Sequence, residues 1–340
     1  MKVSTVLKRQ HSLGPVLLAT ALLWCAPQRP AGAQGATGAR RAETLGAGNH
    51  TLTLNHGGKT RRYVLHIPRG VVAARPVPLI VAFHGGGGEA VGFQDYAGLD
   101  AVSDREGFVV AYPNGSGPLP QRLLTWNAGD CCGYAMNNRV DDVGFAIALI
   151  DDVSKRVSVD AGRVYATGHS NGAMMAYRLA AERADRIAAI VPVAGAYNLA
   201  TFAPSRPVAV LAIHSADDTR ALYGGGMGPA FPGTNTRSSH RPVMDALEQW
   251  RTTNGCSPTP VTRDTRTRAA TGGTEVQSAT YIVWEGCVAG APVAHWKLTT
   301  VGHAWPGNTD LGRRADLVGP ETTIIDSAEE IWRFVKGVKR

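Results

Sequence analysis

Charged residues are scarce in this chain of 340 residues. They make up 18% of it, whereas hydrophobic residues make up 44%. We find no internal repeat and no low-complexity run, which argues against a repeat array or a compositionally biased chain. No linker divides the sequence either. The chain can therefore bury a substantial core, and its length suits one large α/β domain or two small ones.

Long apolar runs are also missing, apart from one at the N-terminus. The first nine residues carry three basic side chains, LGPVLLATALLWCA follows, and Ala31-Gly32-Ala33 ends the segment with small residues. This order is that of a secretion signal, and the run is too short to span a bilayer comfortably. Bulky Trp24 argues against lipid modification of Cys25. We expect a signal peptide at residues 1–33, a flexible tail at 34–48 and a secreted protein, extracellular or periplasmic.

A large net charge is absent once the signal is removed. Cleavage takes away four basic residues and no acidic one, so the formal net charge falls from +8 to +4. No basic run with interleaved aromatic residues appears in the remaining sequence. Nucleic acid is therefore not an expected partner, and we expect no membrane association after cleavage.

Cysteine is scarce, and its arrangement is informative. Four cysteines remain outside the signal: Cys131, Cys132, Cys256 and Cys287. An even number in an oxidising compartment favours disulfide bonds, with three possible pairings. The adjacent cysteines either pair with each other or each reach elsewhere; we hypothesise a vicinal disulfide. We favour Cys256 with Cys287, between a helix end and a strand connection. The spacing does not match paired zinc knuckles, so no metal site is expected.

Strand-like and helix-like segments alternate through most of the chain. Residues 51–54 and 62–67 have the pattern of a hairpin around a Gly-Gly turn. The runs PLIVAFHGGGG, GFVVAYPNG and RVYATG are continuously apolar, as in buried strands, and DDVGFAIALIDDVSKR has helical spacing. The pattern predicts a mainly parallel central sheet with helices on both faces and an N-terminal antiparallel hairpin. We expect one domain over residues 49–340.

A serine lies between two glycines in Gly168-His169-Ser170-Asn171-Gly172. This is the G-x-S-x-G pattern of a nucleophile on a tight strand-to-helix turn, and a strand-like run precedes it and a helix-like run follows. The free amide groups at the helix start would point toward the serine hydroxyl. The pentapeptide alone equally fits an ordinary glycine-rich turn, so its partners decide the interpretation.

A glycine run, His84-Gly85-Gly86-Gly87-Gly88, follows the first buried strand. Such a run resembles the oxyanion loop of lipases, in which backbone amides stabilise the negative oxygen of a tetrahedral intermediate. We expect Asn171 to supply one amide and Gly86 the other. The alternatives are a flexible turn or a phosphate cradle, but the Gly-Lys-Ser/Thr ending of a P-loop is missing.

An acid and a histidine follow in the order that completes a triad. Asp217 and Asp218 come directly after the apolar run VAVLAIHS, and His303 follows the last strand-like run. The order Ser170, Asp218, His303 is that of an α/β-hydrolase and differs from the orders in chymotrypsin and subtilisin. Each element also has a plainer interpretation, since Asp-Asp-Thr makes a good solvated turn and the chain has ten histidines.

Six segments in order resemble the secreted polyhydroxybutyrate depolymerases and feruloyl esterases. They are HGGGG, TWNAGDCC, VDDVGF, RVYATGHSNGAMM, IHSADD with YGGG following, and GHAWPG, spread over about residues 50–337. The resemblance implies an α/β-hydrolase fold, a Ser-Asp-His triad and no cofactor. It assigns the acid to Asp218, four residues after His214. Ser215 stands where the family has glycine, and Ala221-Leu222 stand where it has Val-Pro. Asp217 therefore stays a rival for the acid.

The expected activity is that of a secreted serine esterase. We expect His84, Trp126, Asn127 and Trp305 to contact the substrate, with the Cys131–Cys132 stretch in the same wall as Trp126. Aromatic walls suit a phenolic acyl group or the apolar face of a polyester, although tryptophan in such loops often only packs. The substrate would be a polyhydroxyalkanoate-type ester or a feruloyl or acetyl ester of plant polysaccharide. The alternatives are a serine peptidase of the same fold and a non-catalytic binding protein.

Overall fold

The structure is a computed structural model, and it describes residues 45–71, 75–197, 199–231, 235, 237–269, 275–288, 290–309 and 315–340, without the side chains of 315 and 316. The predicted signal peptide and residues 34–44 of the predicted tail lie outside the described residues. All the described residues belong to one compact unit, residues 42–340.

In the described part of the chain, ten strands form one mixed sheet in the order β1-β2-β4-β3-β5-β6-β7-β12-β11-β10. The six neighbouring strands from β4 to β12 run parallel to one another, and antiparallel pairs lie at both edges. The strands are β1 (Gly48–His56), β2 (Lys59–Ile67), β3 (Val77–Phe83), β4 (Val109–Pro113), β5 (Val159–His169), β6 (Ala189–Val193), β7 (Ala209–Ser215), β10 (Pro260–Ala269), β11 (Val276–Trp284) and β12 (Val293–Thr299). The prediction of a mainly parallel sheet that opens with an antiparallel hairpin is confirmed.

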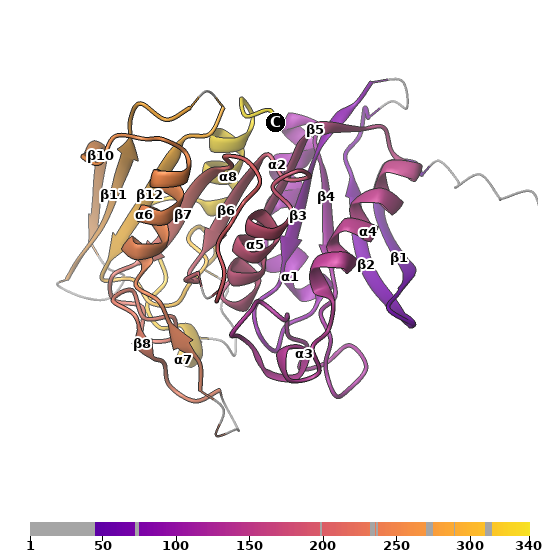
Figure 1. The fold of residues 1–340 in the computed structure, drawn as a ribbon, viewed down its shortest axis with the longest axis horizontal. Helices are drawn as coiled ribbons and strands as arrows, with labels where there is room; N and C mark the ends of the chain where they lie inside the picture. The colour runs from indigo at the N-terminus through magenta and orange to yellow at the C-terminus, as the bar shows by residue number, and fades with distance from the viewer. Residues whose placement is uncertain are drawn as a thin grey trace, which may run out of the picture. The chain divides into compact units, whose positions relative to one another are not determined.

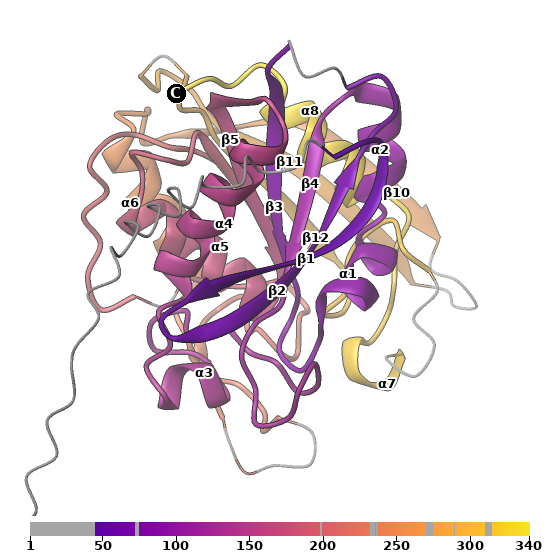
Figure 2. The ribbon, with the colours of Figure 1, turned by 90° about the vertical axis from the view of Figure 1, so that its right-hand side faces the viewer.

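Two layers of helices cover the two faces of the sheet, as Figures 1 and 2 show. The helices are α1 (Ala90–Ala97), α2 (Leu99–Glu106), α3 (Gly133–Asn137), α4 (Asp142–Arg156), α5 (Asn171–Glu182), α6 (Val243–Thr253), α7 (Ala315–Val318) and α8 (Ser327–Val335). Buried residues of α4, α5 and α6 belong to one core cluster, and those of α1, α2 and α8 to another. The central strands are therefore buried on both sides, which explains their continuous apolar sequences.

Strand β3 shows how one apolar run serves both cores. Leu79, Val81 and Phe83 belong to the α4–α6 core, whereas Ile80 and Ala82 belong to the opposite core. This alternation follows from the two-residue period of a strand. Strand β10 was not predicted, because its sequence PVTRDTRTRA is largely polar and exposed. An edge strand with few buried residues lacks the apolar signal on which the prediction depended.

The carboxyl ends of the parallel strands gather the predicted site residues at one edge of the sheet. Phe83 pairs with Gly168 at the ends of β3 and β5, and Ser215 pairs with Leu298 at the ends of β7 and β12. The residues that follow these strands therefore emerge side by side. This is where open α/β sheets bind their ligands. A small two-stranded ribbon, β8 (Gly226–Met227) with β9 (Ser239–His240), and α7 lie at this end of the sheet (Figure 1).

Candidate active site

Ser170 is held in a strained turn between β5 and α5. Strand β5 ends at His169 and α5 begins at Asn171, so a single residue joins them, with φ 56° and ψ −120°. A side chain on Gly172 would overlap the carbonyl oxygen of Phe83, and one on Gly168 would lie 2.5 Å from the carbonyl carbon of Gly172. Glycine is required at both places because backbone atoms already fill the space. Such strain is typical of a functional turn.

Asp218 contacts the imidazole of His303. The distance from Asp218 Oδ2 to His303 Nδ1 is 2.8 Å, and both side chains are buried. Asp218 Oδ1 accepts hydrogen bonds of 2.8 Å from the backbone N–H groups of Arg220 and Ala221. Asp217 instead accepts a hydrogen bond from the backbone N–H of Thr300. Between the two aspartates that the sequence left open, Asp218 is the one paired with the histidine.

A second histidine, His214, contacts the same carboxylate. Its Nε2 lies 3.2 Å from Asp218 Oδ2 and 2.7 Å from the carbonyl oxygen of Ala221. Because a carbonyl only accepts, Nε2 carries the proton and donates it. Burial by itself would raise the pKa of Asp218, but the charge of His303 and hydrogen bonds from both histidines hold it well below its usual range. From the sequence, His214 served only as a marker for the position of the triad acid.

Ser170 and His303 line one cavity of about 330 Å³ at the carboxyl edge of the sheet. The hydrogen bonds of the described residues include none that joins the Ser170 hydroxyl to His303. With Asp218 on Nδ1, the His303 tautomer that carries its proton there leaves Nε2 free to accept one. Contacts between a catalytic serine and its base often tighten only when substrate is bound.

The backbone amides of Gly86 and Asn171, which line the cavity with Ser170, donate no hydrogen bond to another described residue. Two other amides of the glycine loop are engaged, since Gly87 N–H donates to the Leu124 carbonyl at 2.7 Å and Gly88 N–H to the Gly85 carbonyl at 3.0 Å. A Cβ on Gly86 would lie 3.7 Å from Asn171 Cβ. These two amides therefore lie close together at the cavity, and the oxyanion hole expected from the sequence stays a prediction.

His84 holds the glycine loop in place. Its Nδ1 lies 2.7 Å from the Gly85 carbonyl oxygen, and its Nε2 accepts a hydrogen bond of 3.0 Å from Gly115 N–H. Burial lowers the pKa of His84 to about 4, so the ring is neutral near pH 7 and donates from Nδ1. His84 lines the cavity, as expected of a substrate contact. Both ring nitrogens are nevertheless occupied by the protein.

The structure does not bring Trp126, Asn127 or Trp305 to this cavity, which differs from the prediction that they contact substrate. Trp126 is 0% exposed and donates from its indole N–H to the His84 carbonyl, and Trp305 is 1% exposed. The side-chain amide of Asn127 donates to the Val140 carbonyl. The two indoles are buried because each has an internal acceptor for its N–H and an apolar body to pack.

Other side chains form the walls instead. Phe93, Tyr96 and Val318 come from the core cluster of α1, α2 and α8, whereas Cys131, Cys132 and Met174 come from the cluster of α4, α5 and α6. The cavity therefore has one wall from each layer. Sequence reasoning missed Phe93 and Tyr96, although their spacing of three places them on one helix face.

The segment after Asp218 adds polar and aromatic groups to the cavity, among them Arg220, Phe231, Ser238 and His240. Burial, together with the charges of His303 and His214, lowers the pKa of His240 to about 4, against the opposing effect of Asp218. Its Nδ1 is buried and has no hydrogen-bond partner within the described part of the chain. No sequence motif pointed to these residues, because they meet the site only through folding.

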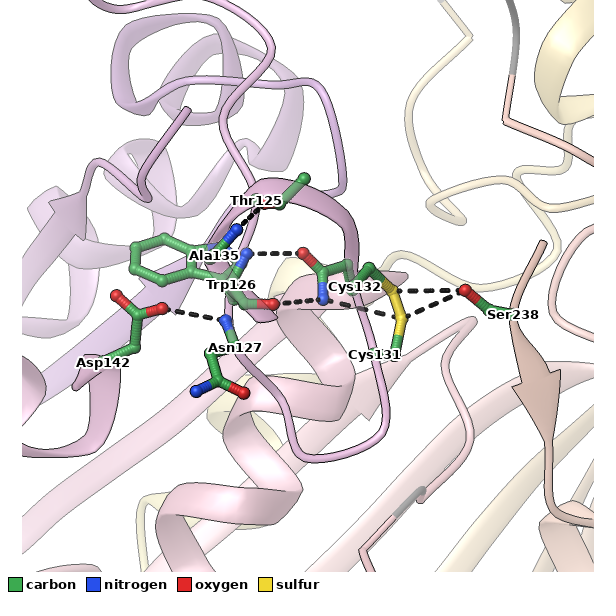
Figure 3. The surroundings of a disulfide bond; sticks show 9 residues. Thr125, Trp126, Asn127, Cys131, Cys132, Ala135, Asp142 and Ser238 are labelled. Carbon is green, nitrogen blue, oxygen red and sulfur yellow. Dashed lines mark hydrogen bonds between the residues drawn. A yellow bond between two sulfur atoms is a disulfide. The ribbon is translucent and has the colours of Figure 1, made fainter. Parts of the chain in front are cut away.

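Both predicted cysteine pairs are at disulfide distance. Cys256 and Cys287 join the end of α6 to the connection between β11 and β12. Cys131 and Cys132 pair with each other (Figure 3), and both line the cavity. Within the described ranges, no three His, Cys, Asp or Glu side chains are grouped to hold a metal ion. No helix in these ranges has the length and apolar character needed to cross a membrane.

Comparison with known proteins places the chain among esterases. Residues 61–228 match the family model described as Esterase PHB depolymerase. The putative esterase NocK of Nocardia uniformis subsp. tsuyamanensis is 31% identical over 82% of this chain and 80% of its own length. Feruloyl esterase B of Piromyces equi is 27% identical over 72% of this chain, which spans only 42% of that enzyme.

A solved structure shows the same fold. The acetyl xylan esterase of Aspergillus awamori superposes with a TM-score of 0.52 over 78% of this chain and 98% of its own, at 17% identity. At this identity the likeness concerns the fold alone. The α/β-hydrolase architecture expected from the sequence is thus confirmed. By sequence, the chain belongs to the Esterase PHB depolymerase family and is a carboxylic ester hydrolase.

Proposed function

We propose that this protein is an exported serine esterase that forms an acyl-enzyme on Ser170. The observation that carries the proposal is the convergence, at one cavity, of a strained serine, a carboxylate-paired histidine and two unengaged amides. A chain that only bound esters would not need all three. The pair of Asp218 and His303 resembles the acid–base half of a hydrolytic triad.

In the first step His303 takes the proton of the Ser170 hydroxyl through Nε2, and the oxygen attacks the ester carbonyl carbon. The imidazolium that forms is stabilised by Asp218, whose low pKa keeps it ionised. The negative carbonyl oxygen of the tetrahedral intermediate accepts hydrogen bonds from Gly86 and Asn171 N–H. His303 then gives its proton to the leaving alcohol oxygen, and the C–O bond breaks.

In the second step water replaces the alcohol. His303 accepts a proton from the water, whose oxygen attacks the acyl carbon of the Ser170 ester. The same amides receive the charge again, and the collapse of the intermediate releases the carboxylic acid and returns the proton to Ser170. All groups needed for both steps are side chains or amides of this chain. The turn at Ser170 fixes the nucleophile beforehand, which reduces the entropic cost of reaching the transition state.

The acyl group we propose is feruloyl, acetyl or a hydroxyalkanoate. Phe93 and Tyr96 give the cavity an aromatic wall suited to a phenolic ring or to the methyl groups of a polyester. Relatives named feruloyl esterase and acetylxylan esterase/xylanase support the first two, and the family name supports the third. Rates on methyl ferulate, acetylated xylan and hydroxybutyrate oligomers, measured side by side, rank these substrates.

We also propose export, on the basis of the N-terminal signal pattern and the two disulfide pairs. Disulfides persist in oxidising compartments. To test this, the protein is recovered from outside the cytoplasm of the producing cell and its N-terminus is sequenced. The mature chain should begin at the residue after Ala33. An intact N-terminus on the exported protein contradicts the cleavage site.

A fluorophosphonate probe tests the catalytic assignment. It should label the protein at Ser170, found by peptide mass mapping, and labelling should abolish ester hydrolysis in proportion. Labelling at another serine, or full activity of the labelled protein, rejects Ser170 as the nucleophile. A peptide panel run beside the esters separates the proposal from a serine peptidase, which would cleave amide bonds at comparable rates.

A further inference from the structure

The side chain of Asn171 binds the loop that carries the vicinal cysteine pair. Asn171 Oδ1 accepts a hydrogen bond of 2.7 Å from Trp126 N–H, and Asn171 Nδ2 donates to the Trp126 carbonyl oxygen at 3.1 Å. All of these atoms are buried. Asn171, which lines the cavity, therefore has both polar atoms of its side chain bonded to a neighbouring segment.

The cysteine pair closes that segment. Cys132 N–H donates to the same Trp126 carbonyl at 3.0 Å, and Ala128 N–H donates to the Cys131 carbonyl. Asn171 Nδ2 also lies 3.9 Å from Cys131 Sγ. The Trp126 carbonyl oxygen thus accepts two hydrogen bonds, one from Cys132 N–H in the disulfide loop and one from the Asn171 side chain. The Trp126 carbonyl oxygen therefore links the cysteine backbone to the Asn171 side chain.

A third segment contacts the sulfur atoms. The Ser238 hydroxyl oxygen lies 3.5 Å from Cys131 Sγ and 3.7 Å from Cys132 Sγ (Figure 3). Ser238 directly precedes β9, on the segment that follows the triad acid Asp218. The sulfur pair therefore lies between the loop that follows β4, the start of α5 and the segment that follows β7. Both sulfur-bearing residues also line the cavity.

We infer that the Cys131–Cys132 disulfide is a positioning element for the oxyanion hole, which it sets by clamping Asn171 through Trp126. This inference rests on the proposed function. The bonded pair keeps the loop from Trp126 to Cys132 closed, the closed loop holds the Asn171 side chain, and the held side chain fixes the direction of the Asn171 backbone N–H. Catalysis depends on such donors being preorganised before charge develops.

Opening the bond should lower kcat more than it raises KM. A water-soluble phosphine reduces the disulfide: the S–S bond breaks, each sulfur gains a proton, and the phosphine becomes its oxide with oxygen from water. Because loss of a whole oxyanion donor costs about 100–1,000-fold in kcat, we expect its misplacement to cost about tenfold or more. A trifluoromethyl ketone, which presents an oxyanion when bound, should lose affinity by a similar factor.

The experiment compares reduced and oxidised enzyme with two matched variants. Cys256→Ser/Cys287→Ser removes the other disulfide, which lies outside the cavity lining, and should keep wild-type kcat and its sensitivity to the phosphine. Cys131→Ala/Cys132→Ala should have the low kcat of the reduced enzyme and no sensitivity. Thermal unfolding of each variant separates a catalytic loss from a folding defect. If Cys131→Ala/Cys132→Ala does not fold, the change of kcat on reduction of the native enzyme still tests the inference.

A double-mutant cycle tests the route through Asn171. Asn171→Ala removes the clamp and keeps the backbone N–H. If the disulfide acts through this side chain, reduction should cost little or nothing in the Asn171→Ala background, because the two changes affect one interaction. If reduction lowers kcat by the same factor in the wild-type enzyme and in Asn171→Ala, the disulfide does not act through the Asn171 side chain.

Confirmed reduction of both cysteines with unchanged kcat overturns the inference as a whole. That outcome is distinguishable from failure of the proposed function, since Ser170→Ala would then still be inactive. If Ser170→Ala itself turned over ester at the wild-type rate, the proposed function would fail instead.

Discussion

Ser170 is the residue on which the proposed chemistry depends most directly. Ser170→Ala should lower kcat by about 10⁴-fold or more, because it removes the nucleophile while the amides still bind substrate. The unfolding midpoint should change little, since the Ser170 side chain makes no hydrogen bond to a described residue. Hydrolysis of a nitrophenyl ester and thermal unfolding measure the two effects. Retention of more than a tenth of the wild-type rate would contradict the assignment.

His214 acts on the reaction only through Asp218. His214→Leu should lower kcat/KM by about tenfold, because the carboxylate loses a hydrogen bond worth about 1.5–3 kcal/mol to a charged acceptor. His214→Gln keeps an N–H donor at a similar reach and should recover much of the loss. The comparison is made from pH profiles of kcat/KM. Equal losses in both variants would indicate that the site needs only the shape of the ring.

At the scale of elements, the junction of β5 and α5 depends on the absence of a side chain at Gly172. Gly172→Ala should lower the free energy of unfolding by about 3 kcal/mol or more and abolish activity, because the new methyl group overlaps backbone atoms of β3. Gly224→Ala is the matched control, since nothing lies within 4 Å of a Cβ at that position. Denaturant unfolding compares the two. A tolerated Gly172→Ala would show that the turn relaxes without cost.

The same elements show where prediction from sequence succeeded. A continuous apolar run reports burial on both faces, so β3, β5 and β7 were found, and the helix predicted at 141–156 is α4 with Asp141 as its N-cap. The edge strand β10 was missed because edge residues carry no such signal. The tryptophan side chains were misplaced for a related reason: an indole needs one acceptor and an apolar surface, and both the cavity and the core offer them.

For the whole molecule, buried histidines predict a dependence of stability on pH. Burial lowers the pKa of His84 and of His240 to about 4 and that of His295 to about 3. Their unfolded value is about 6.5. Below that value the unfolded chain binds protons that the folded protein does not. The free energy of unfolding should therefore fall as the pH decreases from about 6.5 to about 4.

The lowered pKa of Asp218 affects the free energy of unfolding at lower pH than the histidines do. An acid whose folded pKa is lowered stabilises the fold above its unfolded pKa of about 4, and this contribution is lost as the pH falls further. Urea unfolding at a series of pH values measures both effects. His295→Gln, at a buried position outside the cavity lining, should reduce the slope between pH 6.5 and 4. An unchanged slope in this variant contradicts the assignment of the effect to buried histidine.

The sequence by itself determined the class of fold and predicted the proposed nucleophile and the order of the proposed triad, because these depend on local patterns: apolar runs, a glycine-spaced serine, and acids and histidines at strand ends. Only the tertiary structure decided that Asp218 rather than Asp217 meets His303, that His214 shares the carboxylate, and that Phe93 and Tyr96 rather than Trp126 and Trp305 face the cavity. These outcomes depend on which side chains are brought within a few ångströms by strands distant in the chain, and such distances have no local signature.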